Sequence, residues 1–482
     1  MASLNLNWDV LREIARYADR ATCTSLMLTC RFFYREVPKT ILSERVQLSH
    51  VDRVSKFLQF VQANNGSRYH YMRDISFCIS ILPSQLLDSL VRSIARMTRL
   101  ERVRIDFGDA FLNTFPGLAD AIAKLTSLRR LHIVHAGSLT RAFLNSLQSR
   151  LVSVTLTWIY GFLGNGTDPH LLNNHHPVFL LARWTSTLKK LVCKNWRTST
   201  DVPVFNHSYP KLHTLEMDGG KDFPLVAPYI RAFPNLRRLW VETGHSNSVL
   251  GFHASFTERI IRHRERNISS QLDPYEPGTW QHLEEFRGCL VDLYLLGLTS
   301  RISSVRLLKD LRAHHLNFLS DVLSYAQPLH LTIKGESELL THPTCNLNTV
   351  LRKSGAARLE SLDIAIILLA EDGTCDIISL LHDLASSLSQ LPLRKLRLVI
   401  ASDLLVNFDL TDPPLTSAEK ALESFDVDAF VRALGEAIPS LGDAIVEIIR
   451  PRESRGRQGV INRPRVDVAA YMDFLPLDKD DY

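Results

Sequence analysis

The chain has 482 residues, a formal net charge of +5, and a composition of 45% hydrophobic and 22% charged residues. At about 150 residues per domain, this length predicts roughly three domains or one extended array of repeats. The composition excludes a mainly disordered, collagenous or coiled-coil chain, and the small net charge argues against a nucleic-acid partner.

The seven cysteines are scattered and form no CxxC pair. This pattern argues against a disulfide scaffold or a zinc ribbon and indicates reduced thiols. The first residues carry no basic segment followed by an apolar one, and the longest apolar runs, such as 364–370, are well short of the roughly 20 residues of a membrane span. We therefore expect an intracellular protein, cytoplasmic or nuclear, that makes no membrane contact.

Residues 1–45 are expected to form a small helical block. Its first helix would begin after Asn7, a suitable N-cap, with Asp9 in the first turn. The apolar residues expected to share one face of this helix are Val10, Leu11, Ile14 and Ala18. Further helical residues follow, so that the block is expected to hold three short helices, and Pro38 is expected to end the helix that precedes it. So small a block buries too little surface to be stable alone, and some of its large apolar side chains should face a partner.

Residues 46–450 repeat one short pattern, Leu-x-x-Leu-x-Leu, in which Val, Ile or Phe can replace Leu. Clear copies start at Leu100, Leu128, Leu151, Leu188, Leu212, Leu236, Leu359 and Leu393, weaker ones at Leu283, Ile302 and Leu329, and a possible first copy at Met72. The alternation at the end of each copy predicts a strand that is buried on one face. Segments 85–97 and 377–391 between copies have apolar residues at helical spacing. Strand, loop and helix in this order predict a parallel sheet covered by helices.

The spacing of the copies predicts the architecture. Successive copies from Leu100 start 28, 23, 37, 24 and 24 residues apart. Leucine-rich repeats have about 20 to 29 residues, so we predict an irregular α/β solenoid with parallel strands on its concave face and helices on its convex face. Other α/β arrangements remain the alternative. Segment 244–280 is the predicted insertion, and the basic residues within it form either a solvated face or a binding helix.

The middle polar position of each copy should point to the concave face, where a protein substrate would bind. The candidate substrate-binding residues are Arg104, His132, Glu216, Trp240, Asp363 and Arg397. Their mixed charges favour a protein or peptide over a polyanion. Residues 451–482 are expected to be a flexible tail, first basic and then acidic, which leaves an import signal open.

The sequence carries no recognisable catalytic motif. It has no phosphate-binding glycine loop, nucleophile elbow or His-Glu-x-x-His motif. The pairs His175–His176 and His314–His315 are adjacent, so on a helix their side chains diverge by about 100° and do not readily share a metal. We expect these histidines at or near the surface, and we expect no metal site, no cofactor and no active site in this chain.

The amino-terminal block resembles an F-box over about residues 4–42. That motif reads Leu-Pro-x-Asp/Glu-Val/Ile-Leu-x-x-Ile, then a break, then Leu, Cys-Arg/Lys and an aromatic residue. The matching residues are Leu6, Asp9, Val10, Leu11, Ile14, Leu26, Cys30, Arg31 and Phe33, whereas Asn7 stands where the family usually has Pro. An F-box followed by irregular leucine-rich repeats is similar to the large fungal F-box families.

This resemblance implies a non-catalytic, substrate-recognition subunit of a Skp–cullin–F-box ubiquitin ligase. The residues that would bind the Skp-family adaptor, and through it the cullin, are Leu6, Trp8, Asp9, Val10, Leu11, Ile14, Leu26, Cys30 and Phe33. Cys30 is expected to be a small buried side chain at that contact. The alternative is a scaffold or binding protein outside the ubiquitin system, whose amino-terminal helices only cap the solenoid.

Overall fold

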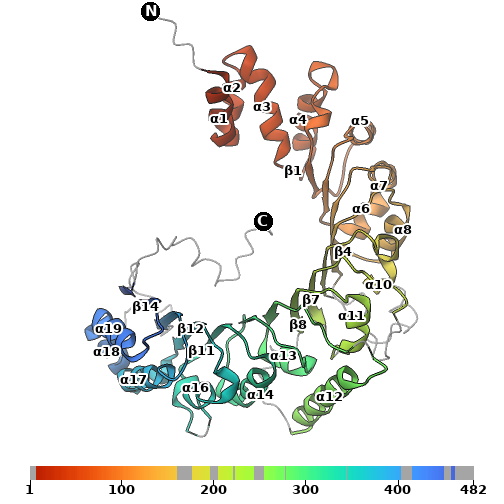
Figure 1. The fold of residues 1–482 in the computed structure, drawn as a ribbon. Coiled ribbons are helices and arrows are strands. Elements are labelled where there is room, and N and C mark those ends of the chain that lie inside the picture. Colours follow the sequence, from red (N-terminus) through yellow and green to blue (C-terminus); the bar gives the residue numbers. More distant parts are fainter. Residues whose placement is uncertain are drawn as a thin grey trace, which may run out of the picture. The chain divides into compact units, whose positions relative to one another are not determined.

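The structure, a computed structural model, describes residues 7–159, 176–195, 205–220, 223–243, 254–276, 278–343, 345–402, 415–449 and 457–461. The chain divides into two compact units, Met1–Asp222 and Phe223–Tyr482. Each unit is an α/β structure in which parallel strands alternate with helices (Figure 1). The predicted α/β class with a parallel sheet is thus confirmed.

The first unit carries parallel strands that pair in chain order. They are β1 (Arg45–Leu48), β2 (Asp74–Phe77), β3 (Arg102–Ile105), β4 (Arg130–Ala136), β5 (Ser153–Trp158), β6 (Lys190–Lys194) and β7 (Thr214–Gly220). Strands β3 to β7 lie at the copies predicted from Leu100 to Leu212, and β2 lies at the possible copy that starts at Met72. Strand β1 was not predicted, because Ser43 stands where the pattern has its leading Leu.

The helices of the first unit comprise the amino-terminal block and the connections between strands. They are α1 (Trp8–Tyr17), α2 (Arg20–Met27), α3 (Arg31–Ser43), α4 (Val51–Gln62), α5 (Ser84–Ala95), α6 (Gly108–Thr114), α7 (Pro116–Ala123), α8 (Ser138–Ser146) and α10 (Pro177–Leu180), with the 3-10 turns η1 (Asn64–Gly66), η2 (Tyr69–Tyr71) and η3 (Ala182–Trp184). Helix α5 confirms the helix predicted at 85–97. Helices α5 to α8 lie on one side of the strands (Figure 1).

The second unit continues the same alternation. Its parallel strands are β8 (Arg238–Thr243), β9 (Glu285–Gly288), β10 (Ser304–Leu307), β11 (His330–Glu336), β12 (Ser361–Leu368), β13 (Lys395–Ser402) and β14 (Asp443–Ile449). Its helices are α11 (Val226–Ala232), α12 (Ala254–Leu272), α13 (Leu290–Leu296), α14 (Leu316–Ala326), α15 (Glu338–Thr341), α16 (Leu347–Leu351), α17 (Ile377–Leu388), α18 (Ser417–Ser424) and α19 (Val427–Ala437), with η5 (Ala313–His315), η6 (Ser354–Ala356) and η7 (Ala370–Thr374). Helix α17 confirms the helix predicted at 377–391.

The repeated pattern explains how each strand joins the core. In β12, Leu362 and Ile364 are buried toward the helices, whereas Asp363 between them is half-exposed. The leading Leu359 is fully buried just before the strand. Burying a Leu or Ile side chain contributes about 1.5–3 kcal/mol, so each copy supplies its own share of a continuous apolar core.

The weak copy at Leu283 has a physical cause in β9. Gly288 occupies the place where other copies have a larger apolar residue, and its φ is +153°. A Cβ at this position would collide with the carbonyl oxygen of Val241 on β8. Glycine is needed there because the two strands approach closely, and the apolar signature of the copy is weakened as a result.

The structure places a packed helix within the predicted insertion at 244–280. Helix α12 lies within it, between β8 and β9, where the other repeats also carry helices. Asn267 on α12 is completely buried: its Oδ1 accepts a hydrogen bond from Val226 N at 3.0 Å, and its Nδ2 donates to Leu295 O at 2.9 Å. Arg264 is also buried and donates to Tyr294 O at 2.8 Å, so the basic run is only partly a solvated face.

Two further expectations fail at the level of single segments. Pro38 lies inside α3 rather than ending a helix, because buried Val37, Ile41 and Leu42 continue the packed face of α3 through the proline. In the tail predicted to be flexible, β15 (Arg457–Ile461) pairs antiparallel with β14 and extends the sheet; the other residues of 451–482 lie outside the described residues. Within the described ranges, no helix combines the length and the apolar character needed to cross a membrane.

Candidate functional site

The amino-terminal block has a closed core of its own. Its buried side chains are Ala15, Cys23, Met27, Phe33, Val37 and Ile41, and Leu11, Ala18, Leu26, Phe32 and Phe60 pack against them half-buried. Phe60 belongs to α4, so the core of the block continues into the first repeat. Asn7 caps α1 by accepting a hydrogen bond from Asp9 N at 3.2 Å, as predicted, and Asp19 caps α2 by accepting one from Thr22 N at 2.7 Å.

Helix α1 carries two adjacent apolar faces that point in different directions. Leu11, Ala15 and Ala18, spaced by four and three residues, face the core of the block. The side chains of Val10, Ile14 and Tyr17 have the same spacing but are 46%, 44% and 84% exposed. We call these three residues the outward stripe. The expected single face of Val10, Leu11, Ile14 and Ala18 is therefore wrong, since it is split between core and solvent.

The residues predicted to bind an adaptor fall into three groups. Exposed side chains are Trp8, Asp9, Val10, Ile14 and Cys30. Side chains that belong to the core of the block are Leu11 and Leu26, which are half-buried, and Phe33, which is 7% exposed. Leu6 lies outside the described residues. Phe33 is thus a structural residue, because α1 and α2 already cover it. Cys30 is exposed in this chain, and its burial at an adaptor contact stays a prediction.

Sequence reasoning missed two exposed apolar residues of the block. Tyr17 extends the outward stripe by one turn, and Leu28, which caps the end of α2, is 86% exposed. Tyr17 had a signal in the sequence, because it follows Val10 and Ile14 at helical spacing. Leu28 had none, since it stands one residue after the last residue of α2.

The predicted substrate-binding positions of the first unit lie in register. Arg104 on β3 is paired with His132 on β4, which is paired with Thr155 on β5. The same row continues through Val192 on β6 to Glu216 on β7. All are half-exposed except Val192, which is buried. Arg104 is held by Asp106, at 2.6 Å from its Nε.

The second unit carries a corresponding row. Trp240, Arg287, Arg306, Thr332, Asp363 and Arg397 occupy matching register positions on consecutive strands β8 to β13. The prediction named Trp240, Asp363 and Arg397. It omitted Arg287, Arg306 and Thr332, which belong to the weaker copies at Leu283, Ile302 and Leu329.

Acidic side chains on the same sheet face bind the arginines of this row. Glu285 lies 2.8 Å from Arg287 Nε and 3.3 Å from Arg306 Nε. Arg397 contacts Asp363 at 4.0 Å and Glu447 at 3.9 Å. Burial raises the pKa of both Asp363 and Glu447, and Arg397 opposes this rise. The face is therefore half-buried and carries charges of both signs, with Trp240 next to Arg287 in register.

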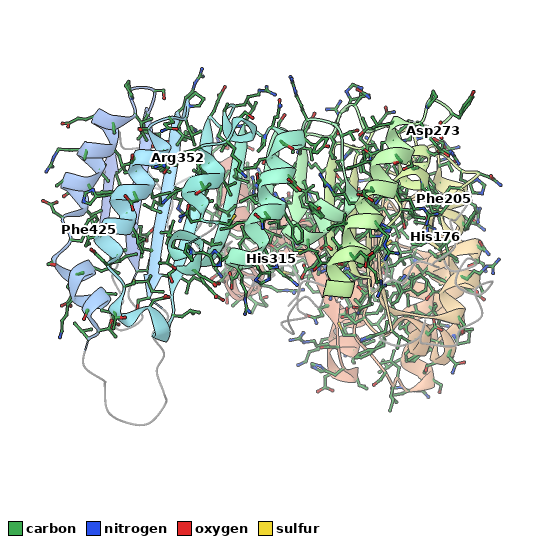
Figure 2. All side chains as sticks on the ribbon, turned by 90° about the horizontal axis from the view of Figure 1, so that it is seen from below. His176, Phe205, Asp273, His315, Arg352 and Phe425 are labelled. Atoms are coloured by element: carbon green, nitrogen blue, oxygen red, sulfur yellow. The ribbon has the colours of Figure 1, made fainter. Side chains whose placement is uncertain are left out.

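Among the described histidines of the two adjacent pairs, His176 is more buried than expected. His176 is buried against Phe205, at 4.5 Å between ring centroids, and this burial lowers its pKa to about 3 (Figure 2). The expectation of a surface or half-buried side chain is wrong for His176; its neighbour His175 lies outside the described residues. Burial also lowers the pKa of His315 to about 4. In the described part of the chain, no three His, Cys, Asp or Glu side chains gather as they would around a metal ion.

No protein-family model matches the chain, and no curated protein matches it significantly.

Proposed function

We propose that this chain is a non-catalytic substrate-recognition subunit of a Skp–cullin–F-box ubiquitin ligase. The amino-terminal block would be an F-box that binds a Skp-family adaptor, which in turn binds a cullin. The remaining α/β repeats would be diverged leucine-rich repeats that hold a protein substrate. Ubiquitin transfer would be carried out by other subunits, and this chain would contribute proximity between substrate and enzyme.

The outward stripe is the observation that carries the proposal. A block whose core is already closed has no folding reason to expose Val10, Ile14 and Tyr17 on one helix face. An amphipathic helix that lays such a stripe into an apolar groove is a common mode of protein recognition. The sequence resemblance of the block to an F-box supports a Skp-family adaptor as this partner.

The in-register rows support the second half of the proposal. Half-exposed side chains of both charges, with Trp240 beside them, suit a peptide or a protein surface. Strands are about 4.8 Å apart in a sheet, so neighbouring members of a row can contact neighbouring parts of one ligand.

Co-expression tests the proposal directly. The full chain should co-purify with a Skp-family adaptor as a stoichiometric complex, and a cullin should join only when the adaptor is present. A full chain that is folded but binds no Skp-family adaptor would contradict the proposed function.

A further inference from the structure

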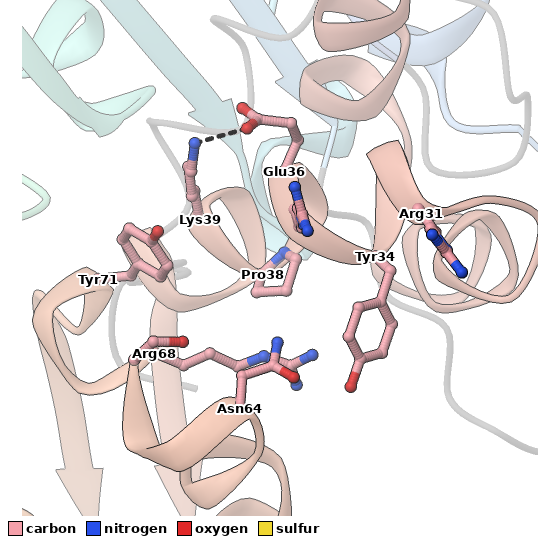
Figure 3. Close-up of a pocket in the computed structure, with 10 residues that line it drawn as sticks. Arg31, Tyr34, Glu36, Pro38, Lys39, Asn64, Arg68 and Tyr71 are labelled. Carbon is pink, nitrogen blue, oxygen red and sulfur yellow. Dashed lines mark hydrogen bonds and ion pairs between the residues drawn. The ribbon is translucent and has the colours of Figure 1, made fainter.

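A pocket of about 680 Å³ opens between α3 and the turns η1 and η2 (Figure 3). Four cationic side chains line it: Arg31, Arg35 and Lys39 from α3, and Arg68 from the segment between η1 and η2. The pocket lies wholly within the first unit and involves none of the residues of the outward stripe.

The pocket has more positive than negative charge. Glu36 is the carboxylate among its lining residues, and it lies 2.6 Å from Lys39 Nζ and 3.4 Å from Arg12 Nε. The hydrogen bond from Lys39 lowers the pKa of Glu36, which is therefore ionised and already engaged. Across the described residues, Arg31, Arg35 and Arg68 form no ion pair with a carboxylate.

Arg68 is the unusual member of this group because it is only 3% exposed. Its guanidinium carbon lies 4.4 Å from the ring centroid of Phe60 and 4.9 Å from that of Tyr34. Nη1 donates to Phe60 O at 3.0 Å, whereas Nη2 is buried and has no partner within the described ranges. Two aromatic rings and one carbonyl offset only part of the free-energy cost of burying a guanidinium. A bound anion would offset the remainder.

The turn that carries Arg68 is held in an unusual conformation. Asn64 and Asn65 have φ of 54° and 56°, and Gly66 has φ of 75°. A Cβ on Gly66 would lie 2.5 Å from the ring of Tyr69. Asparagine tolerates the left-handed region better than other non-glycine residues, and at Gly66 the close contact with Tyr69 leaves no room for a Cβ. The pocket wall is thus preformed by the fold.

We propose that this pocket binds a small soluble phosphate-bearing anion of the diphosphate class. The planar fork of a guanidinium matches phosphate oxygens with two hydrogen bonds. The three arginines without carboxylate partners match the charge of a diphosphate better than that of a single phosphate, which carries about −2. The volume falls within the roughly 300–1,000 Å³ of small-molecule sites, which favours a small molecule over a phosphorylated peptide chain.

The position of the pocket gives the anion a structural consequence. It contacts both α3, which belongs to the amino-terminal block, and the turn that follows α4 of the first repeat. A bound diphosphate would therefore connect the block to the first repeat. This role does not depend on whether the block binds an adaptor.

Calorimetric titration of the full chain with inorganic pyrophosphate, at constant ionic strength set with sodium chloride, tests the proposal. We expect one site and a rise in melting temperature on binding, with inorganic phosphate and a phosphoserine peptide binding at least tenfold more weakly. Arg31→Ala and Arg35→Ala should each weaken pyrophosphate binding at least tenfold. Arg53→Ala, an exposed arginine of α4 outside the pocket, is the matched control and should bind like the wild type.

Arg68→Met should change anion binding and stability in opposite directions. It should abolish pyrophosphate binding, yet its melting temperature without anion should equal or exceed that of the wild type, because an uncompensated buried charge has been removed. No binding of pyrophosphate by the wild type, unchanged binding by Arg35→Ala, or tighter binding of the phosphoserine peptide would each overturn the proposal. If Arg68→Met does not fold, the Arg31→Ala and Arg35→Ala titrations decide the outcome.

Discussion

The indole of Trp8 and the ring of Phe32 lie 4.5 Å apart between centroids, which joins the start of α1 to the start of α3. Phe32 in turn contacts Phe33 at 5.5 Å in an edge-to-face arrangement. Trp8 is 60% exposed, whereas Phe33 is buried. Three aromatic rings thus connect the surface of the amino-terminal block to its core. Phe33, at the buried end, serves folding, whereas Trp8, at the exposed end, is accessible to a partner.

Truncation of the Phe33 side chain should destabilise the amino-terminal block. Phe33→Ala leaves a cavity in a core of few side chains and is expected to cost about 3–5 kcal/mol. Hydrogen exchange should show that amides of α1 to α3 lose protection while those of β3 to β5 keep it. Leu28→Ala is the control, because Leu28 is already exposed. Equal protection of α1 to α3 in Phe33→Ala and the wild type would show that Phe33 is not part of a cooperative core.

Acid should weaken the first unit through His176. Burial lowers the pKa of His176 to about 3, whereas an unfolded histidine titrates near 6.5. Below pH 6.5 the unfolded chain binds a proton that the folded chain does not, so stability falls as the pH falls from about 6.5 toward about 3. Between pH 7.5 and pH 4.5, this single group lowers the free energy of unfolding by about 3 kcal/mol.

His176→Asn isolates that contribution. Asn can still accept the hydrogen bond that Val178 N donates to His176 Nδ1 at 3.2 Å, but it does not titrate. We expect the variant to be less stable at pH 7.5, where packing against Phe205 is lost, and its deficit to shrink by about 3 kcal/mol at pH 4.5. Urea denaturation at the two pH values measures this. A deficit that stays constant would contradict the assigned role of His176.

Arg397 should stabilise the second unit in a pH-dependent way. Burial raises the pKa of Asp363 and Glu447, and Arg397 is their shared cation. Arg397→Gln should raise both pKa values further. When a carboxyl group has a raised pKa in the folded state, the folded protein loses stability as the pH rises and the group ionises. The variant should therefore be destabilised at pH 7.5 and far less at pH 4.

The size of the Arg397 effect is set by its half-exposed position. Because solvent screens these ion pairs, we expect Arg397→Gln to lower the free energy of unfolding by only about 1–2 kcal/mol at pH 7.5. Arg394→Gln is the matched control: Arg394 precedes the same strand, but its contact with Glu360, at 3.8 Å, is exposed and should be worth less than about 0.5 kcal/mol. Equal losses for the two variants, or a larger loss for Arg397→Gln at pH 4, would refute this account.

The strands could be predicted because each copy encodes its own local structure. Burial of the leading Leu and of alternate strand residues recurs from Leu100 to Leu393, so the register of Arg104 with His132 follows from pattern alone. Strands β1 and β14 were not predicted because Ser43 and Ala444 replace a large apolar residue at one position of the pattern. Strand β15 was not predicted because it belongs to no copy of the pattern, and its antiparallel pairing with β14 is formed only in the tertiary structure.

The candidate site was harder to predict than the fold. Val10 and Leu11 are adjacent and both apolar, and their faces on α1 differ by about 100°. Only the positions of α2 and α3 decide that Leu11 is covered and Val10 is not. The pocket beside Arg68 had no sequence signal, because it joins α3 to a turn about thirty residues later in the chain.

The affinity of the full-length Ile14→Asp variant for a Skp-family adaptor measures the adaptor-binding role of the outward stripe. Ile14 lies outside the core of the block, so the variant should keep the melting temperature of the wild type. We expect its dissociation constant to rise at least tenfold, while Thr24→Asp, which places the same charge on an exposed position of α2, binds like the wild type. Equal affinities of Ile14→Asp, Thr24→Asp and the wild type would contradict an adaptor-binding role for the outward stripe.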